Sequence, residues 1–566
     1  MKLRHILALG MLVSVGMSAV SLAQEKKEPP QRDVKVVPST AQPTPEEEQA
    51  PLPKIENPEF VITGHETMEL PEAAKSATDD ARSFVPPLPS AGQKTSDLSR
   101  TATKQSIGSS RSNGMNGKVY GSFGNFVTPQ LGAWFGQSYD QGSVAVNGRY
   151  ASSDGYMTNT NWLSAGFGVA GSYKLGKWEN ILSESRWKGE LAAGTDEYRA
   201  YGSAHPRQKR THNDLDAAIG ADSRFATGLP DLAPVDGAMR LAWNRTSLSD
   251  TSSAVENDIG ILASGTTLYA SVPVDLAMEY RITGESMPRA DVQTMQWLSL
   301  SGSGKIAALE NLQFTLGASF TFYRGNTGAS SLRLYPALGV RWFPARWAGL
   351  HAAFQPSVTR QTLRQLLRTN RYVLTGSAIL PTDAPAAFSA GIDLAPIERA
   401  ALSVTVDYRA LNNFQSFLES DSSHIWSPVY LSDIRSVKTD VRIRYALTPL
   451  DAATGFVTVN SVKHKDSTSM LPYIPEMTAG ILYRHWFQSD ISAEISAEYT
   501  GRRFTDFQAR HANAAYALIG MKAEYGIARN LRLTAEVQNL FDQKYYIWNG
   551  YRERPFFVSF GINYLW

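Results

Sequence analysis

The chain ends in the stretch Phe556-Phe557-Val558-Ser559-Phe560-Gly561-Ile562-Asn563-Tyr564-Leu565-Trp566, which decides the fold. Every second residue is apolar, and the row consists of Phe556, Val558, Phe560, Ile562, Tyr564 and Trp566. Because successive side chains of a β-strand point to opposite faces, this row forms one face of a single strand. Outer-membrane assembly machinery recognises an exposed strand edge with an aromatic end. We therefore predict an assembly signal here and a strand that closes a barrel against the first strand. The alternative is a core strand that stops at the last residue by chance.

The same alternation recurs from about residue 118 to the end of the chain. In the segment 312–323, every even-numbered residue is apolar and most odd-numbered residues are small or polar. The segments 274–283 and 491–500 repeat the pattern with charged residues on the polar side. Such period-two patterning predicts β-strands. Counting the segments gives about 22 strands, and an even number is typical of single-chain bacterial barrels.

Strands with one apolar and one charged face need two different surroundings. Soluble β-sandwiches meet this need, but their strands are usually about five or six residues long, and these segments are longer. The apolar faces end repeatedly in an aromatic residue, which is typical of the girdle at a membrane interface; examples are Tyr280, Tyr408, Tyr445 and Tyr499. The charged faces suit a hydrated lumen. The sequence therefore predicts an all-β fold, a transmembrane antiparallel β-barrel of about 22 strands over residues 115–566.

The composition excludes several other classes. The chain has 566 residues, no cysteine, 55 Lys and Arg against 53 Asp and Glu, and a mean hydropathy of -0.26. A disulfide scaffold, a thiolate metal centre, a thiol enzyme and a helical membrane bundle are thereby excluded. The net charge of +2 gives no reason to expect nucleic acid as a partner. Length alone would favour three or four soluble domains at about 150 residues each, but a single large barrel replaces that expectation.

The N-terminal region divides into two segments. Residues 1–23 carry Lys2 and Arg4, then an apolar run, then Ser21-Leu22-Ala23, which predicts a secretory signal peptide. A membrane anchor is the alternative, but the apolar run is shorter than the roughly 20 residues that span a bilayer. Residues 24–114 are rich in Pro, Glu, Lys and Ser and poor in aromatic residues. Such a segment cannot bury enough apolar surface to fold, so we predict a disordered Pro-rich periplasmic arm.

One apolar, β-prone island interrupts this arm. It consists of Phe60, Val61, Ile62, Thr63 and Gly64. A short strand of this kind could pair with the sheet edge of a periplasmic partner. A chance apolar cluster in a linker is an equally good interpretation at this point.

Connection lengths give the barrel an orientation. An even strand count places both termini at the same side, which is the periplasmic side for an exported protein. Short turns fall on that side, and the long connections 195–212, 359–385, 410–436 and 540–555 fall on the other, as barrels of this class require. The connection 359–385 is rich in Arg, and 410–436 contains Phe414, Phe417, Trp426 and Tyr430. Solvated loop chemistry and capture of a ligand or partner both remain open for them.

The C-terminal part of the chain resembles TonB-dependent outer-membrane receptors. The resemblance rests on the segment 471–475 before a strand, the motif Asn539-Leu540-Phe541-Asp542 followed by Tyr545, and the aromatic-ended last strand. It implies a 22-stranded barrel in the outer membrane and places the island Phe60–Gly64 where such receptors carry their energy-coupling segment. Receptors of this family also carry a folded plug domain before the barrel, and no plug motif is found in this arm.

The resemblance without a plug predicts a receptor-like barrel that takes part in transport of a nutrient or in a transport complex. Because an unplugged barrel of this size would be a wide hole, its lumen must be filled by the arm, the loops or a partner. A passive diffusion porin and a structural or assembly subunit of an outer-membrane complex are the alternatives. The expected partners are outer-membrane lipid, the barrel-assembly machinery, an energy-transducing periplasmic protein, a separate plug or a surface lipoprotein.

No pattern in the sequence indicates an enzyme. The nine His residues are scattered without a pair at metal-ligand spacing, and no nucleophile and base arrangement or phosphate loop stands out. We predict no catalytic residues, no metal and no cofactor.

Overall fold

The computed structural model describes residues 115–175, 182–226, 232–250, 253–287, 290–325, 330–376, 378–420, 423–487 and 490–566. The predicted signal peptide, the arm and the island Phe60–Gly64 lie outside the described residues. Within the described residues, no helix is both long and apolar enough to cross a membrane.

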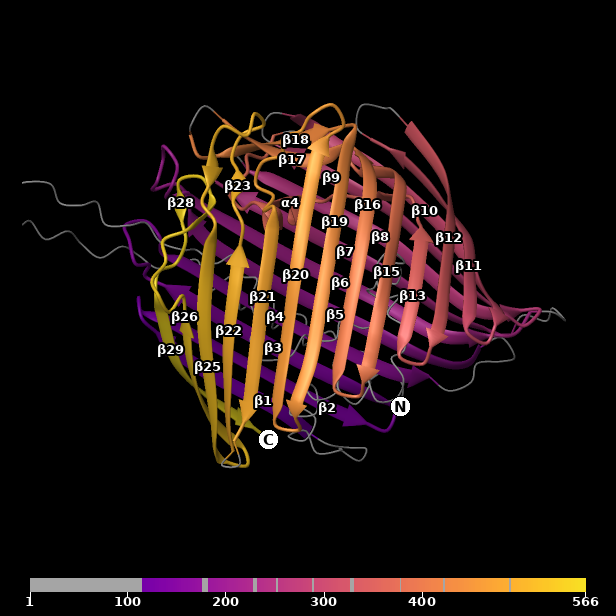
Figure 1. The fold of residues 1–566 in the computed structure, drawn as a ribbon, viewed down its shortest axis with the longest axis horizontal. Coiled ribbons are helices and arrows are strands. Elements are labelled where there is room, and N and C mark those ends of the chain that lie inside the picture. Colours follow the sequence, from indigo (N-terminus) through magenta and orange to yellow (C-terminus); the bar gives the residue numbers. More distant parts are fainter. Residues whose placement is uncertain are drawn as a thin grey trace, which may run out of the picture. The chain divides into compact units, whose positions relative to one another are not determined.

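The wall is one closed antiparallel β-barrel (Figure 1). Its sheet has 23 strands, and β13 and β14 form a single crossing because both pair with β15, so the chain crosses 22 times. This confirms the predicted fold and strand number. The wall strands are β1 (Met115–Gly124), β2 (Thr128–Tyr139), β3 (Gly142–Ser153), β4 (Trp162–Leu175), β5 (Leu182–Arg199), β6 (Lys209–Phe225), β7 (Val235–Ser249), β8 (Ala254–Tyr269), β9 (Val272–Met287), β10 (Ala290–Leu309), β11 (Leu312–Arg324), β12 (Ser330–Ala345), β13 (Ala348–Phe354), β14 (Ser357–Thr359), β15 (Thr382–Ile397), β16 (Ala400–Asn412), β19 (Ile434–Thr448), β20 (Asp451–His464), β21 (Met477–Trp486), β22 (Ile491–Thr500), β25 (Tyr516–Ala528), β26 (Leu531–Gln538) and β29 (Phe557–Leu565).

Alternation sets which side chains face lipid and which face the lumen. On β7, Met239 and Leu241 are exposed on the outer surface, and Arg240 between them pairs with Glu190 of β5 across the inner surface. The C-terminal row behaves as the alternation predicts, since Phe560 is 66% exposed. The described strands therefore carry an apolar outer face and a charged inner face.

The barrel closes where β1 pairs with β29, with Val119 opposite Tyr564. At the end of this seam, the backbone N–H groups of Gly117 and Trp566 each donate to the carbonyl of the other at 3.0 Å. The Trp566 ring covers Gly117 so closely that an added Cβ would lie 2.1 Å from the ring. Any larger residue at this position would displace the ring, so glycine allows Trp566 to sit on the seam. The predicted closing role of the last strand is confirmed, and its role as an assembly signal stays a prediction.

We expect Gly117→Ala to weaken this seam by about 1–3 kcal/mol, because the added methyl group displaces the Trp566 ring. Gly284→Ala is the matched control, since an added Cβ at this strand position meets no atom within 4 Å. The measurement is the urea midpoint of the folded barrel in detergent micelles. Equal midpoints for the two variants would contradict the role given to Gly117.

The two ends of the barrel differ in their connections. At the end where β1 begins and β29 ends, here called the terminal end, β8 joins β9 through residues 270–271 and β10 joins β11 through residues 310–311. At the opposite end, here called the loop end, long connections contain elements of their own (Figure 1). These are α4 (Leu363–Thr369), β17 (Phe414–Glu419), β18 (Trp426–Leu431), β23 (Arg503–Phe504), β24 (Ala512–Asn513), β27 (Tyr546–Trp548) and β28 (Tyr551–Arg552). The sequence did not predict them.

Candidate functional site: the loop end of the barrel

The connection between β14 and β15 folds into the barrel, and its described residues, 360–376 and 378–381, are called the in-folded segment. Its helix α4 begins at a capping box, in which the Thr362 side chain accepts from the Gln365 N–H and the Gln365 side chain accepts from the Thr362 N–H. Its apolar side consists of Leu363, Leu366 and Leu367, all buried. A seven-residue helix is too short to be stable alone, so packing of this side holds it.

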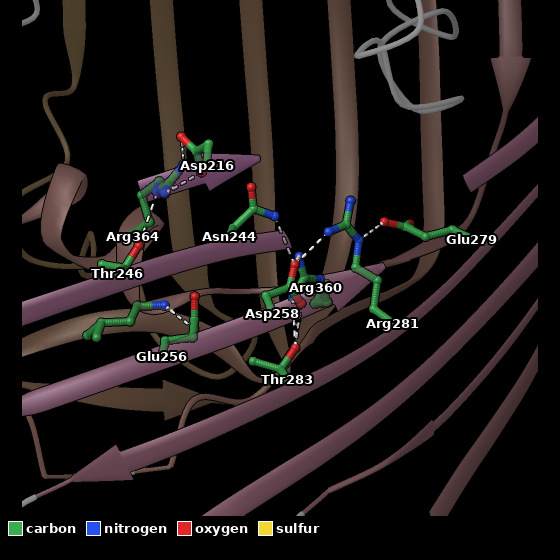
Figure 2. Close-up of polar contacts among 11 residues, drawn as sticks. Asp216, Asn244, Thr246, Glu256, Asp258, Glu279, Arg281, Thr283, Arg360 and Arg364 are labelled. Atoms are coloured by element: carbon green, nitrogen blue, oxygen red, sulfur yellow. Dashed lines mark hydrogen bonds and ion pairs between the residues drawn. The ribbon is translucent and has the colours of Figure 1, made fainter. Parts of the chain in front are cut away.

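Two arginines of the in-folded segment bind carboxylates on the inner wall (Figure 2). Arg360 donates to Asp258 of β8 at 2.7 Å. Arg364 lies 2.9 Å from Asp214 and 2.7 Å from Asp216, both on β6. These carboxylates face the lumen, because neighbouring residues such as Ile259 are exposed on the lipid side. The segment therefore lies against the inside of the wall.

The carboxylates around Arg364 stabilise the charged form of its guanidinium. Burial by itself lowers the pKa of the Arg364 guanidinium, but hydrogen bonds and charges from Asp216 and Asp214 outweigh burial, and the pKa is raised. Guanidinium groups form paired hydrogen bonds with carboxylates in a fixed geometry, which orients the segment as well as attracting it.

Backbone groups of the segment are also held by the wall. The Leu363 N–H donates to the Glu256 carboxylate at 2.7 Å. In the other direction, the Arg210 guanidinium of β6 donates to the carbonyls of Arg371 and Val373, each at 2.7 Å. Arg210 is itself 3% exposed and paired with Asp250 at 3.1 Å. Buried backbone groups are costly unless they are paired, so these contacts specify where the segment lies.

An apolar core joins the segment to the other long connections. The core and the residues around it are called the cap. Burial raises the pKa of Tyr372 and of Tyr201 well above the ordinary value, so both rings are neutral in the cap. The buried residues of the cap are Tyr198, Tyr201, Leu248, Ala254, Met287, Leu363, Leu366, Leu367, Tyr372, Val373, Ile379, Phe417, Trp426, Trp548 and Tyr551.

Connections from distant strands meet in the cap. Tyr372 of the in-folded segment stacks on Tyr551 of the β26–β29 connection, with ring centroids 3.6 Å apart. The Ala204 N–H in the β5–β6 connection donates to the Ser423 carbonyl in the β16–β19 connection at 3.3 Å. Those two connections are separated by ten strands of a 22-strand ring, so they begin on nearly opposite sides of the barrel. The cap therefore crosses the mouth at the loop end.

Charges on the inner wall compensate one another. Seven ion pairs lie on the lumen face, and most of them join neighbouring or nearby strands. In one of them, Lys305 of β10 lies 2.7 Å from Asp275 of β9. In each of these seven pairs, one wall residue compensates the charge of another. The pairs are Lys188 with Asp222, Arg240 with Glu190, Arg281 with Glu279, Lys305 with Asp275, Lys438 with Asp440, Arg484 with Glu494 and Lys522 with Glu524.

Two aromatic residues of the connection 410–436 are buried rather than solvated. Trp426 is fully buried and Phe417 is 6% exposed, and both pack against Trp548. The solvated interpretation of these two side chains is wrong, because they are buried in the cap, and capture of a ligand or partner stays a prediction. The side chains of Phe414 and Tyr430 are half-buried.

The motif that resembles TonB-dependent receptors forms a turn at the start of the β26–β29 connection. Asn539 and Asp542 have positive φ angles of 47° and 51°, which Asn and Asp tolerate. The Asn539 amide donates to the Arg554 carbonyl at 3.1 Å, and the Asp542 carboxylate accepts from the Phe556 N–H at 2.9 Å. The motif thus joins the two ends of this connection. Its other residues are Leu540, which is half-buried, Phe541, which is exposed, and Tyr545, which is buried.

The in-folded segment is the feature that the sequence did not reveal. Its signals are a capping box, an apolar triplet at helical spacing, and two arginines four residues apart. Together they predict a short amphipathic helix, but the carboxylates that attract it lie over a hundred residues earlier. Among the described residues, no group of three or more His, Asp or Glu could hold a metal ion.

Comparisons with known proteins place the fold. The structure is similar to the copper transporter OprC, with a TM-score of 0.62, 13% identity and coverage of 80% of each chain. The FrpB iron transporter of Neisseria meningitidis is similar with a TM-score of 0.63 and 11% identity, over 82% of this chain and 83% of that chain. The ferric-catecholate import receptor Fiu of E. coli K12 is similar with a TM-score of 0.60 and 13% identity, over 80% of this chain and 82% of that chain. No family model matches the chain, and no curated protein matches its sequence.

These solved structures are TonB-dependent receptors, so the barrel fold that the C-terminal motif implied is confirmed. At such low identity the likeness concerns the fold. The named proteins are transporters and receptors rather than enzymes.

Proposed function

We propose that this protein is an outer-membrane barrel that takes part in nutrient transport and whose outer mouth is closed by its own cap. The loop end faces the outside and both termini face the periplasm. The observation that carries the proposal is the cap itself, in which connections from opposite sides of the barrel meet. A substrate entering from outside must displace these loops, so transport requires the cap to open.

The compensated inner wall supports a barrel that works without a folded plug of its own. Charged wall residues usually need a partner, and in pairs such as Lys305 with Asp275 and Lys522 with Glu524 another wall residue supplies it. Below the cap, water, the arm or a separate plug then occupies the lumen. We propose that the island Phe60–Gly64 binds an energy-transducing periplasmic protein, because an extended apolar segment can add a strand to a partner sheet.

Conductance distinguishes this function from passive diffusion. Purified wild-type protein in a planar bilayer is expected to show no large current steps without ligand, because the cap crosses the mouth. The measurement is single-channel current at fixed voltage and salt, with a general porin as the positive control. Large, ligand-independent steps from the wild-type protein would establish an open porin and reject the closed mouth.

A further inference from the structure

Two glutamates on the inner wall face each other beneath the in-folded segment. Glu256 of β8 and Glu285 of β9 are direct register partners, and both side chains point inward. They are 4% and 2% exposed. Two neighbouring carboxylates that are shielded from water repel each other when both are charged, so the doubly ionised pair is unfavourable.

Each glutamate holds one end of the in-folded segment. The Glu256 carboxylate accepts from the Leu363 N–H at 2.7 Å, and the Glu285 carboxylate accepts from the Ile379 N–H. One oxygen of Glu285 has no hydrogen-bond partner in the described part of the chain. A buried carboxylate oxygen without a donor is costly, and a proton on this oxygen removes that cost.

The charges around the pair come from three elements. On the in-folded segment, Arg360 and Arg364 favour the ionised form of Glu256, and Arg360 also acts on Glu285. On β8, Asp258 disfavours ionisation of Glu256. On β18, Tyr430 interacts electrostatically with Glu285. Both arginines are already engaged, Arg360 by Asp258 and Arg364 by Asp214, so neither fully neutralises the pair.

The pair lies beyond the membrane-spanning part of its strands. The outermost large apolar pair exposed to lipid on β8 and β9 is Ile259 with Ile282. The next outward-facing residues toward the loop end are Asn257 and Gly284, followed by Ser286 opposite Val255. Burial is the largest influence on both glutamates and raises the pKa of Glu256; burial and the neighbouring Glu256 raise the pKa of Glu285.

We propose that Glu256 and Glu285 form a proton-dependent latch, which holds the in-folded segment on the wall while the pair carries a proton and releases it when both are ionised. Because the pKa values are raised only when the segment covers the pair, the closed state binds more protons than the open state. Closure is therefore strongest at low pH and is lost as the pH rises through the raised pKa values. The latch rests on the proposed function, whose closed mouth it would regulate.

A single-cysteine reporter tests the latch without any transport assay. The chain contains no cysteine, so Val373→Cys introduces one thiol in the fully buried part of the segment. We measure the rate at which this thiol reacts with a membrane-impermeant maleimide. The rate is divided by the rate for Thr369→Cys, an exposed site on the same segment. This division removes the pH dependence that comes from ionisation of the thiol itself. We expect this normalised rate to rise by up to about tenfold per unit of pH for each ionising glutamate between the ordinary pKa of Glu and the raised pKa values, and to level off above them.

The same reporter in the Glu256→Gln, Glu285→Gln background is expected to react slowly at every pH, because the amide oxygens still accept from the segment and cannot ionise. Asp222→Asn is the matched control, since it removes a wall carboxylate far from the segment and should keep the pH-dependent rise. A flat profile for the parent reporter would overturn the latch. An unchanged rise, or constantly fast labelling, in the double glutamine variant would also overturn it.

Ala254→Cys serves as a second reporter, because this buried wall residue belongs to the same apolar core and changes little in size. Retained folding is checked by resistance of each barrel to unfolding in SDS without heating. Conductance is recorded separately, so a closed mouth without a pH response rejects the latch alone, and an open mouth rejects the proposed function.

Discussion

Replacing residues 360–381 by an Asn-Gly turn is expected to convert a silent barrel into one with large, ligand-independent current steps. Thr359 and Thr382 are register partners at the base of the segment, so a two-residue turn can join β14 to β15 without moving either strand. The variant lacks both wall-binding arginines and the helix that packs in the cap. A 22-stranded barrel without this filling is wide enough for an aqueous channel.

Smaller changes should give graded effects in the same recording. Arg360→Ala with Arg364→Ala removes the ion pairs to Asp258 and Asp214 but keeps the apolar side of α4, so brief openings are expected. Lys209→Ala is the matched control, because it removes an exposed ion pair with Glu197 and should leave the barrel silent. A silent deletion variant would contradict the role of the segment. A conducting barrel that lacks residues 24–114 but keeps the cap would assign closure to the arm.

Trp426→Ala is expected to destabilise the cap by about 3–5 kcal/mol, because a fully buried indole is removed from the centre of its core. Trp426 packs against Tyr473, Trp548 and Tyr551. The measurement is hydrogen exchange of the four long connections, which should lose protection while the wall strands keep theirs.

Trp342→Ala is the control for that substitution, since Trp342 is 44% exposed on the lipid face and contributes nothing to the cap. It should leave exchange in the connections unchanged. Full protection of the connections in the Trp426 variant would show that the loops are held independently and would refute a shared core.

The wall could be predicted from the sequence because its rules are local. Alternation at positions such as Met239, Arg240 and Leu241 reports directly which face meets lipid and which meets the lumen. The predicted segments 274–283, 312–323 and 491–500 all lie in wall strands, although strands such as β9 extend further toward the loop end. At that level both faces are polar or covered by the cap, as at Asn257, so the apolar alternation fades before the strand ends.

The cap could not be predicted because its contacts join distant parts of the chain. Arg210 binds carbonyls more than 160 residues later, and Tyr201 donates to the Arg552 carbonyl 351 residues away. In the sequence, the aromatic residues of these connections look the same whether they bind a ligand or pack together. Trp426 illustrates this, since only the meeting of four connections shows that it is buried.

The most direct test of a mouth crossed by its own loops is a disulfide between Ala204→Cys and Ser423→Cys. These residues belong to connections ten strands apart, and the Ala204 N–H lies 3.3 Å from the Ser423 carbonyl. Because the chain has no other cysteine, any intramolecular disulfide must join these two positions. We predict that the disulfide forms spontaneously in isolated outer membranes and keeps the mouth closed until it is reduced. Absence of the disulfide in a correctly folded barrel would contradict the closed mouth.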